Sequence, residues 1–290
     1  MMRWPPGPLH DKAAGSWTWR ELLKAAFAAS LLVSACAPED GSVAGMTPAS
    51  RGSTTGSQSL VVFAASSLTD AFQDVGRGFE AENPGVALTF NFASSQALRT
   101  QIEEGAAADV FASASLKEME VLAAEGMLVG VAQTFATNLL TIVVPLDNPA
   151  DIESPLDLAR PGVKLVLAAE EVPVGGYARQ AIDLLAGLYG ASFSEAVSRN
   201  VVSNEDNVKQ IVAKVQLGEA DAGIVYETDA HGAASLITIP IPREKNVVAE
   251  YPIAVLAQTT NGNLAAAFVE YLHSPDGLDA LKRWGFRPPL

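Results

Sequence analysis

Residues 60–70 have the sequence LVVFAASSLTD, in which an uninterrupted apolar run passes directly into two serines. The apolar residues 60–65 are typical of a short strand that is buried on both faces of a sheet. Ser67 and Asp70 resemble a helix capping box, with aspartate in place of the usual glutamate. Beyond the serines, apolar residues recur at helical spacing, at Leu68, Phe72, Val75 and Phe79. The stretch therefore predicts a strand, a serine junction and a helix that ends at Asn83-Pro84-Gly85.

The same alternation continues along the chain. Further apolar or alternating runs predict strands at residues 86–92, 109–114, 138–145, 163–168, 222–226, 237–241 and 250–257. Helices are predicted from Ser94-Ser95 to Gly105, and at residues 116–125, 155–159, 175–188, 204–217, 263–273 and 275–284. Strands that alternate with helices predict an α/β fold whose mainly parallel sheets carry helices on both faces.

The composition is that of a chain with a large folded core. Of its 290 residues, 49% are hydrophobic and 18% are charged, which excludes an acidic disordered protein. The formal net charge of −14 excludes nucleic acid as a partner, because binding to a phosphate backbone needs a basic face. The same charge also argues, at first sight, against an anionic ligand.

Metal sites, disulfides and common catalytic motifs find no support. The chain has one cysteine, Cys36, and its three histidines, His10, His231 and His273, are too few and too scattered for a Cys/His metal cage. The sequence contains no HExxH, no P-loop and no GxSxG pattern. We therefore expect no direct protein ligands to a metal ion, no cofactor and no catalytic residue.

Residues 1–35 are predicted to be a signal peptide. Two basic residues, Arg20 and Lys24, precede the apolar run 25–33, which is too short to span a bilayer as a stable helix. A basic flank, a short apolar run and small residues after it are typical of a secretory signal. We therefore expect an extracytoplasmic protein.

The apolar run ends in Val33-Ser34-Ala35-Cys36, which resembles the lipobox of bacterial lipoproteins. That resemblance implies that Cys36 is lipidated and becomes the first residue of a membrane-anchored protein. The alternative is an ordinary cleavage site with a cysteine there by chance. Residues 36–59 are rich in small and polar residues, which predicts a flexible tether before a folded part that begins at Leu60.

Four predicted junctions before helices are suited to binding an anion. Doubled serines, Ser66-Ser67 and Ser94-Ser95, follow the first two strands, and Val174-Gly175-Gly176 and Asp206-Asn207-Val208 lie at the starts of two later helices. In open α/β sheets ligands bind beyond the carboxyl ends of the strands, where helix N-termini present free N–H groups. Several such termini aimed at one point form an anion site without lysine or arginine. The alternative for each junction is an ordinary helix cap or turn.

Longer motifs surround these junctions and continue to the end of the chain. They are VFAASSLTDA (62–71), FASS (92–95), QIEEGA (101–106), ADVF (108–111), VPVGGYA (172–178), EDNV (205–208), GIVY (223–226), YPIAV (251–255) and RWGF (283–286). In combination these motifs resemble those of the molybdate-binding proteins of bacterial ABC importers. The resemblance covers residues 60–290.

The resemblance implies a two-lobed periplasmic-binding-protein fold of type II that closes on a tetrahedral oxyanion. Residues that match the family's molybdate-binding positions are Ser67 and Ser95 through their hydroxyls, Val174 and Val208 through their backbone N–H groups, and Tyr226 through its hydroxyl. Position 174 is commonly alanine in the family, and the chain is one residue longer near Asn207, which makes the match of Val208 less direct.

The chemistry of the ligand agrees with this set of residues. Molybdate is fully ionised at neutral pH, so its site needs hydrogen-bond donors only. Phosphate keeps a proton near pH 7 and favours an additional carboxylate, for which Asp70 and Asp206 are the nearest candidates. Three nearby cations could steer an anion, but we interpret them as solvated helix-face charges: Arg99, Arg179 and Lys209.

The family also implies how the chain is organised and what it contacts. The first lobe is expected to comprise residues 60–138 and 249–290, and the second residues 139–248, with a hinge in two strands near 139–144 and 251–255. Expected partners are molybdate or tungstate, the importer's membrane permease and a lipid anchor at Cys36, with the protein itself a monomer.

Two alternatives remain open from the sequence. A hydrolase with a nucleophilic serine would need His231 or His273 within hydrogen-bond reach of Ser67 or Ser95. A binding protein for sulfate, phosphate or a small organic acid would use the same junctions, and sulfate differs from molybdate chiefly in its smaller size. The dimensions of the site decide the second alternative.

Overall fold

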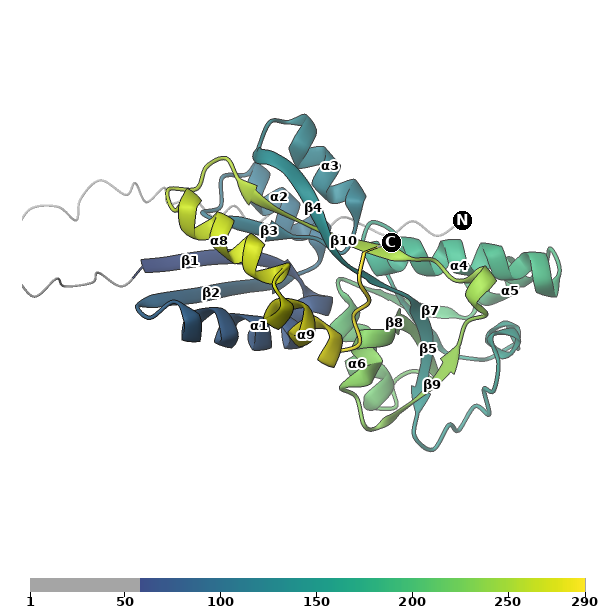
Figure 1. The fold of residues 1–290 in the computed structure, drawn as a ribbon. Coiled ribbons are helices and arrows are strands. Elements are labelled where there is room, and N and C mark those ends of the chain that lie inside the picture. Colours follow the sequence, from purple (N-terminus) through teal and green to yellow (C-terminus); the bar gives the residue numbers. More distant parts are fainter. Residues whose placement is uncertain (1–57, 290) are drawn as a thin grey trace, which may run out of the picture. The chain divides into compact units, whose positions relative to one another are not determined.

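The computed structural model describes residues 58–289, which form two five-stranded sheets with flanking helices (Figure 1). The predicted signal peptide, Cys36 and nearly all of the predicted tether lie outside the described residues. The folded part begins slightly before Leu60, because Gln58 and Ser59 already pair with the neighbouring strand. Within residues 58–289, the structure has no helix long and apolar enough to cross a membrane.

The first sheet has the strand order β2-β1-β3-β10-β4. Its strands are β1 (Gln58–Ala65), β2 (Val86–Ala93), β3 (Val110–Ala112), β4 (Leu128–Asn138) and β10 (Ala249–Leu256). β1 runs parallel to β2 and β3, whereas β10 runs antiparallel to β3 and β4. The helical elements of this part are η1 (Ser66–Leu68), α1 (Thr69–Glu82), α2 (Ser95–Glu103), α3 (Leu116–Ala124), α8 (Gly262–Leu272) and α9 (Pro275–Arg283).

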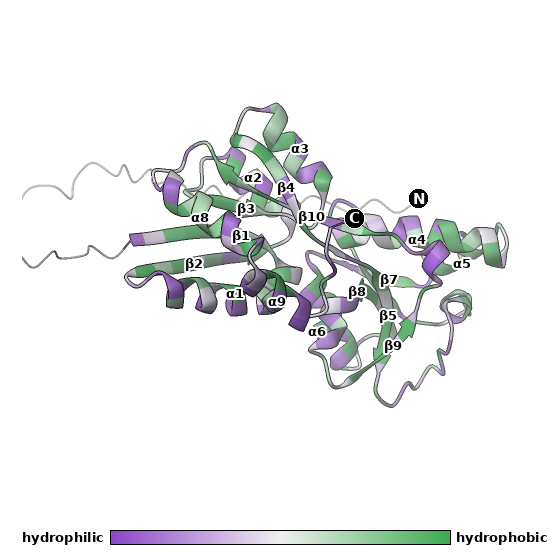
Figure 2. Cartoon of the chain, in the orientation of Figure 1, coloured by the Kyte–Doolittle hydropathy of each residue, from purple (hydrophilic) through white to green (hydrophobic). Residues whose placement is uncertain are grey.

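Alternate residues of β1 enter two separate cores. Leu60 and Val62 belong to the same core as Phe72 of α1, whereas Phe63 belongs to a second core with Leu98 of α2. This alternation follows from the strand geometry, in which successive side chains point to opposite faces. The prediction of a strand buried on both faces is therefore confirmed. In Figure 2, α1 alternates between hydrophilic and hydrophobic residues, as a helix with one buried face does.

The second sheet repeats this plan with the strand order β7-β6-β8-β5-β9. Its strands are β5 (Leu140–Pro145), β6 (Leu165–Ala168), β7 (Val201–Glu205), β8 (Ala222–Tyr226) and β9 (Leu236–Pro240). β6 runs parallel to β7 and β8, whereas β5 runs antiparallel to β8 and β9. The helical elements are η2 (Pro155–Ala159), α4 (Pro173–Tyr189), α5 (Phe193–Arg199), α6 (Val208–Gln216), α7 (Glu227–His231) and η3 (Arg243–Lys245).

The chain crosses between the two sheets twice. It leaves the first sheet at Leu139, between β4 and β5, and returns between β9 and β10. The two crossings are tied together, because the Asn246 side chain accepts a hydrogen bond from the Leu140 N–H (3.0 Å) and donates one to the Leu140 carbonyl (2.8 Å). The two connecting segments therefore lie side by side.

Several predictions from the sequence differ from the structure. The sheets are mixed rather than mainly parallel, because β10 and β5 join as antiparallel strands. The predicted helix 204–217 begins only at Val208, since residues 201–205 form β7 and Asn207 caps the helix. The elements that the sequence analysis missed are β4, β7, α5, α7 and the short 3₁₀ helix η3. The short element at residues 155–159 is confirmed, as a 3₁₀ helix.

The predicted capping box at Ser67 is wrong. Residues 66–68 form the 3₁₀ turn η1, and no side-chain cap hydrogen bond is made at the start of either η1 or α1. The Ser67 hydroxyl instead accepts a hydrogen bond from the Tyr251 hydroxyl (3.1 Å), which lies on β10. This serine is therefore held by the sheet rather than by its own helix.

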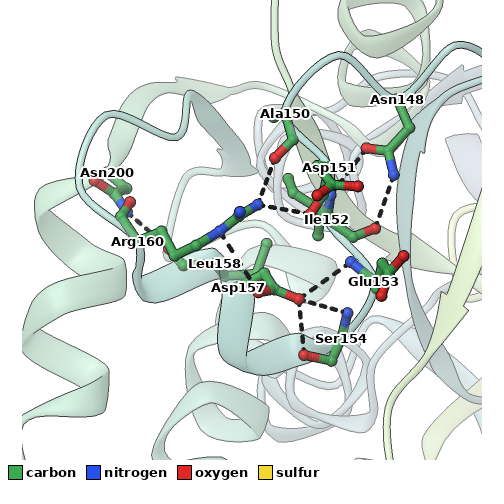
Figure 3. Close-up of polar contacts among 10 residues, drawn as sticks. All are labelled: Asn148, Ala150, Asp151, Ile152, Glu153, Ser154, Asp157, Leu158, Arg160 and Asn200. Atoms are coloured by element: carbon green, nitrogen blue, oxygen red, sulfur yellow. Dashed lines mark hydrogen bonds and ion pairs between the residues drawn. The ribbon is translucent and has the colours of Figure 1, made fainter.

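A loop between β5 and β6 is fixed by side chains that bond to backbone (Figure 3). Asn148 has a positive φ of 38°, and its amide bonds both the N–H (3.1 Å) and the carbonyl (3.0 Å) of Ile152. Asn200, at the end of α5, donates to the carbonyls of Leu158 (2.8 Å) and Arg160 (2.7 Å). These bonds attach the loop to the outer edge of the second sheet.

Candidate functional site

A small cavity lies where the carboxyl ends of strands from both sheets meet. We call it the inter-sheet cavity. All five residues predicted to bind the ligand line it: Ser67, Ser95, Val174, Val208 and Tyr226. The other lining residues are Ala65, Ser66, Ser94, Ala114, Val172 and Pro173. Binding beyond the carboxyl ends of strands is the general rule for open α/β sheets.

The hydroxyl oxygen of each predicted serine accepts a hydrogen bond from a residue outside its own helix. The Ser67 Oγ accepts from the Tyr251 hydroxyl (3.1 Å), and the Ser95 Oγ accepts from the Ala114 N–H (3.0 Å). A serine hydroxyl has one proton to donate in addition to the bonds that it accepts. Because both serines are buried and line the cavity, each retains its proton for a group inside it.

Backbone N–H groups reach the cavity from two helices of the second sheet. Val174 is the second residue of α4 and Val208 is the first residue of α6, so neither N–H has a partner within its helix. The Asn207 side chain caps α6 by accepting from the Gln210 N–H (3.2 Å). The partial positive charge of each helix N-terminus adds to the attraction for an anion.

Gly175 fixes the N-terminus of α4 against the end of β6. A Cβ at this position would lie 2.0 Å from the Ala169 carbonyl oxygen and 2.6 Å from that of Ala168. Arg179 also holds this junction, because its guanidinium donates to the carbonyls of Ala168 (2.8 Å) and Gly175 (2.9 Å). Gly175 therefore permits a close backbone approach that places Val174 at the cavity.

Tyr226 supplies a buried hydroxyl at the end of β8. Its oxygen has no hydrogen-bond partner among residues 58–289, and its ring packs edge-on against Tyr251 with centroids 5.8 Å apart. Burial raises the pKa of both tyrosines well above the ordinary value, so both hydroxyls stay protonated. A buried polar group without a partner is costly. The Tyr226 hydroxyl is thus available to donate to a ligand.

The cations near the site are engaged with groups of the protein itself. Arg99 bonds the carboxylates of Glu103 and Glu118 (2.7 Å to the latter), and Arg179 bonds backbone carbonyls as described above. Lys209 forms ion pairs with Asp70 (2.8 Å) and Asp229 (3.1 Å). They are therefore paired groups rather than the freely solvated charges that the sequence suggested.

No charged residue of the described chain lines the cavity. Of the two carboxylates considered for a protonated ligand, Asp70 is paired with Lys209 and Asp206 is exposed. The polar groups that face the cavity are thus hydroxyls and backbone N–H groups. Such a donor set suits an anion without a proton to share, because rigid dipoles replace the water around it.

Sequence reasoning missed the residues behind the site. Tyr251 orients Ser67 through its hydroxyl. The Asn138 side-chain amide lies 3.5 Å from the Tyr251 hydroxyl and donates to the Thr228 hydroxyl (2.8 Å). Asp229 is fully buried beside Lys209. Burial raises the pKa of Asp229 to about 6, against the opposing effect of Lys209. A single hydroxyl within the apolar run of β10 was the available sequence signal for Tyr251.

The arrangement does not match a hydrolase. Neither His231 nor His273 lines the cavity, so the structure places no base beside Ser67 or Ser95. Within the part of the chain that the structure describes, no group of three or more His, Cys, Asp or Glu side chains could hold a metal ion.

Comparison with known proteins agrees with this geometry. The family model for bacterial extracellular solute-binding proteins matches residues 60–287. The molybdate-binding protein ModA of Mycobacterium tuberculosis is 41% identical over 239 residues, which cover 82% of this chain and 88% of ModA. ModA of Escherichia coli is 34% identical over 235 residues, which cover 78% of this chain and 88% of that protein.

A solved structure shows the same fold. The periplasmic molybdate-binding protein of Azotobacter vinelandii superposes with a TM-score of 0.70 at 21% identity, covering 80% of this chain and all (100%) of that protein. This likeness confirms the type II periplasmic-binding-protein architecture. The chain belongs to the family of bacterial extracellular solute-binding proteins that includes the molybdate-binding protein ModA.

Proposed function

We propose that this chain is the extracytoplasmic solute-binding component of an ABC importer, and that it captures molybdate or tungstate for delivery to the membrane permease. Family membership supports the transport role, since relatives that cover most of the chain are molybdate-binding proteins. The protein is not an enzyme, and molybdate is its ligand rather than a cofactor. We infer that it acts as a monomer.

The observation that carries the choice of ligand is a small cavity whose described lining offers hydroxyl and backbone N–H donors and no charged side chain. Ser67, Ser95 and Tyr226 offer hydroxyl protons, and Val174 and Val208 offer backbone N–H groups. A fully ionised tetrahedral oxyanion accepts at every oxygen and fits this set. The valine at 174, where the family commonly has alanine, keeps the N–H donor.

This donor set also separates the alternatives. Monoprotonated phosphate would find no carboxylate to accept its proton, because no carboxylate lines the cavity among the described residues. Sulfate carries the same charge as molybdate but is smaller, so rigidly placed donors would reach its oxygens less well. We therefore expect sulfate to bind more weakly than molybdate.

Capture requires the cavity to open. We infer that residues 60–138 and 249–290 form one lobe and residues 139–248 the other, and that they move as in other hinge closures. Support comes from the topology, since each range contains one complete sheet. The strands near 139–144 and 251–255, on either side of the crossings, would act as the hinge.

Calorimetric titration tests the function directly. The purified protein should bind molybdate and tungstate more tightly than sulfate or phosphate at the same pH and ionic strength. If sulfate or phosphate bound more tightly than molybdate, that oxyanion would be the ligand instead. Failure to bind any of the four oxyanions would remove the proposal.

We further infer that Cys36 anchors the protein at the outer face of the membrane through lipid. The support is the sequence VSAC at 33–36, which lies outside the described residues. Acyl chains on Cys36 together provide stable anchoring, whereas one chain alone does not. Cys36→Ser should move the protein from the membrane fraction to the soluble extracytoplasmic fraction. Unchanged fractionation would contradict the anchor.

A further inference from the structure

An ion-pair cluster connects the two sides of the inter-sheet cavity. Lys209 lies on α6 directly after Val208, and α6 packs against η1, which leads into α1 (Figure 1). The Lys209 ammonium is 3.1 Å from a carboxylate oxygen of Asp229 on α7 and 2.8 Å from one of Asp70 on α1. One partner therefore belongs to the second sheet's part of the chain and the other to the first.

The two carboxylates differ in their surroundings. The Asp229 side chain is fully buried (0% exposed), whereas the side chains of Asp70 and Lys209 are 46% and 33% exposed. Burial lowers the pKa of Lys209, but the carboxylates of Asp229 and Asp70 outweigh it and raise that pKa above its ordinary value. Lys209 thus stays charged, with Asp229 as its fixed partner and Asp70 as the one that reaches across.

We propose that Lys209 is a positioning residue for ligand binding, which uses its ion pair with Asp70 to hold the α6 N-terminus against the serine side of the cavity. The inference rests on the proposed function and adds a residue pair to it. Opening the cavity would separate Lys209 from Asp70, while the pair with Asp229 would persist within one lobe. The closed, ligand-holding state therefore gains an interaction that the open state lacks.

A second ion pair between the two parts of the chain has a different position. Arg287 bonds Glu227 (2.6 Å), and the Glu227 N–H donates to the carbonyl of Leu139 (2.9 Å) at the first crossing between the sheets. A contact beside the hinge changes little as the lobes rotate. Of these two ion pairs, Lys209–Asp70 is therefore the one that forms on closure and breaks on opening.

The experiment compares Asp70→Asn with a matched control on the same helix. Asp74→Asn removes the same charge one turn further along α1, and the partners of Asp74, Arg77 and Arg283, both lie in the first sheet's part of the chain. Titration with molybdate and a displacement measurement of its dissociation rate are made on the wild type and both variants.

We expect Asp70→Asn to raise the Kd for molybdate about threefold to tenfold through faster dissociation, the range for a partly exposed ion pair. Asp74→Asn should stay within about twofold of the wild type, since the ion pairs of Asp74 lie within one lobe and do not depend on closure. If the Lys209 ion-pair cluster affected binding only through its electrostatic field, removing the negative charge of Asp70 would tighten the binding of a dianion. An unchanged or lower Kd in Asp70→Asn would therefore overturn the proposal.

A second readout separates this proposal from the proposed function. If the wild type binds none of the four oxyanions, the proposed function fails, and small-angle X-ray scattering on the ligand-free proteins decides the role of the pair. A larger radius of gyration in Asp70→Asn than in the wild type and Asp74→Asn would support it. Equal radii would overturn it.

Discussion

Replacing Ser67 or Ser95 by alanine is expected to weaken molybdate binding by about 1.5–3 kcal/mol each, the scale of a hydrogen bond to a charged group. Both oxygens already accept a hydrogen bond from the protein, Ser67 from Tyr251 and Ser95 from Ala114. Each hydroxyl proton is therefore aimed at the cavity. Alanine removes a donor that the buried dianion has no water to replace. Calorimetric titration of each variant measures the loss.

The control distinguishes ligand binding from helix capping. Ser274 caps α9 by accepting from the Gly277 N–H (3.2 Å), and it does not line the cavity. Ser274→Ala should lower the free energy of unfolding by about 1 kcal/mol and leave the Kd for molybdate unchanged. If Ser67→Ala and Ser95→Ala behaved like Ser274→Ala, with binding losses below about 0.5 kcal/mol, the serines would be structural residues only.

Much of the fold could be predicted because its strands are short apolar runs with turn residues at their ends. β1 and β8 were predicted to within a few residues for this reason. β7 was missed because three of the five residues in its sequence, VVSNE, are polar and the strand lies at an edge of the sheet, where burial is incomplete. Strand direction could not be predicted from the sequence. An antiparallel strand that is buried on both faces, such as β5, has the same continuous apolar pattern as a parallel strand.

The site was predicted where local sequence determines it. Ser95, Val174 and Val208 were placed at helix starts before any packing was known, but the helix at Val208 was predicted to begin at residue 204, within what is β7. The contacts behind them join residues distant in sequence, such as Tyr251 with Ser67 and Lys209 with Asp70. Such contacts depend on how the two sheets come together, which no local pattern records.

The acidic composition has no bearing on the site itself. Net charge acts over long range on solubility and on the rate of encounter, whereas binding in a buried cavity depends on the nearest dipoles. The described residues that line the cavity are uncharged, and Lys209, which follows the lining residue Val208, is balanced by two carboxylates. A strongly acidic chain can therefore present a site for a dianion.

Gly175→Ala is expected to impair both binding and folding. The new Cβ would lie 2.0 Å from the Ala169 carbonyl oxygen, a distance at which the backbone of α4 or of the β6 end must move. Overpacking of this kind costs about 1–3 kcal/mol of stability. Displacement of α4 also moves the Val174 N–H. The binding free energy for molybdate should therefore weaken by about 1.5–3 kcal/mol. Chemical denaturation and calorimetry measure the two effects.

Gly187→Ala on the same helix separates this clash from the general effect of alanine in α4. A Cβ at Gly187 meets nothing closer than the Lys245 ammonium at 3.6 Å, and alanine is the better helix former by about 1 kcal/mol. Gly187→Ala should therefore bind molybdate like the wild type and unfold at equal or higher denaturant concentration. If Gly175→Ala did the same, the close approach of α4 to β6 would not position Val174. The opposite outcomes at Gly175 and Gly187 would locate the requirement at the helix N-terminus, whose backbone belongs to the proposed anion site.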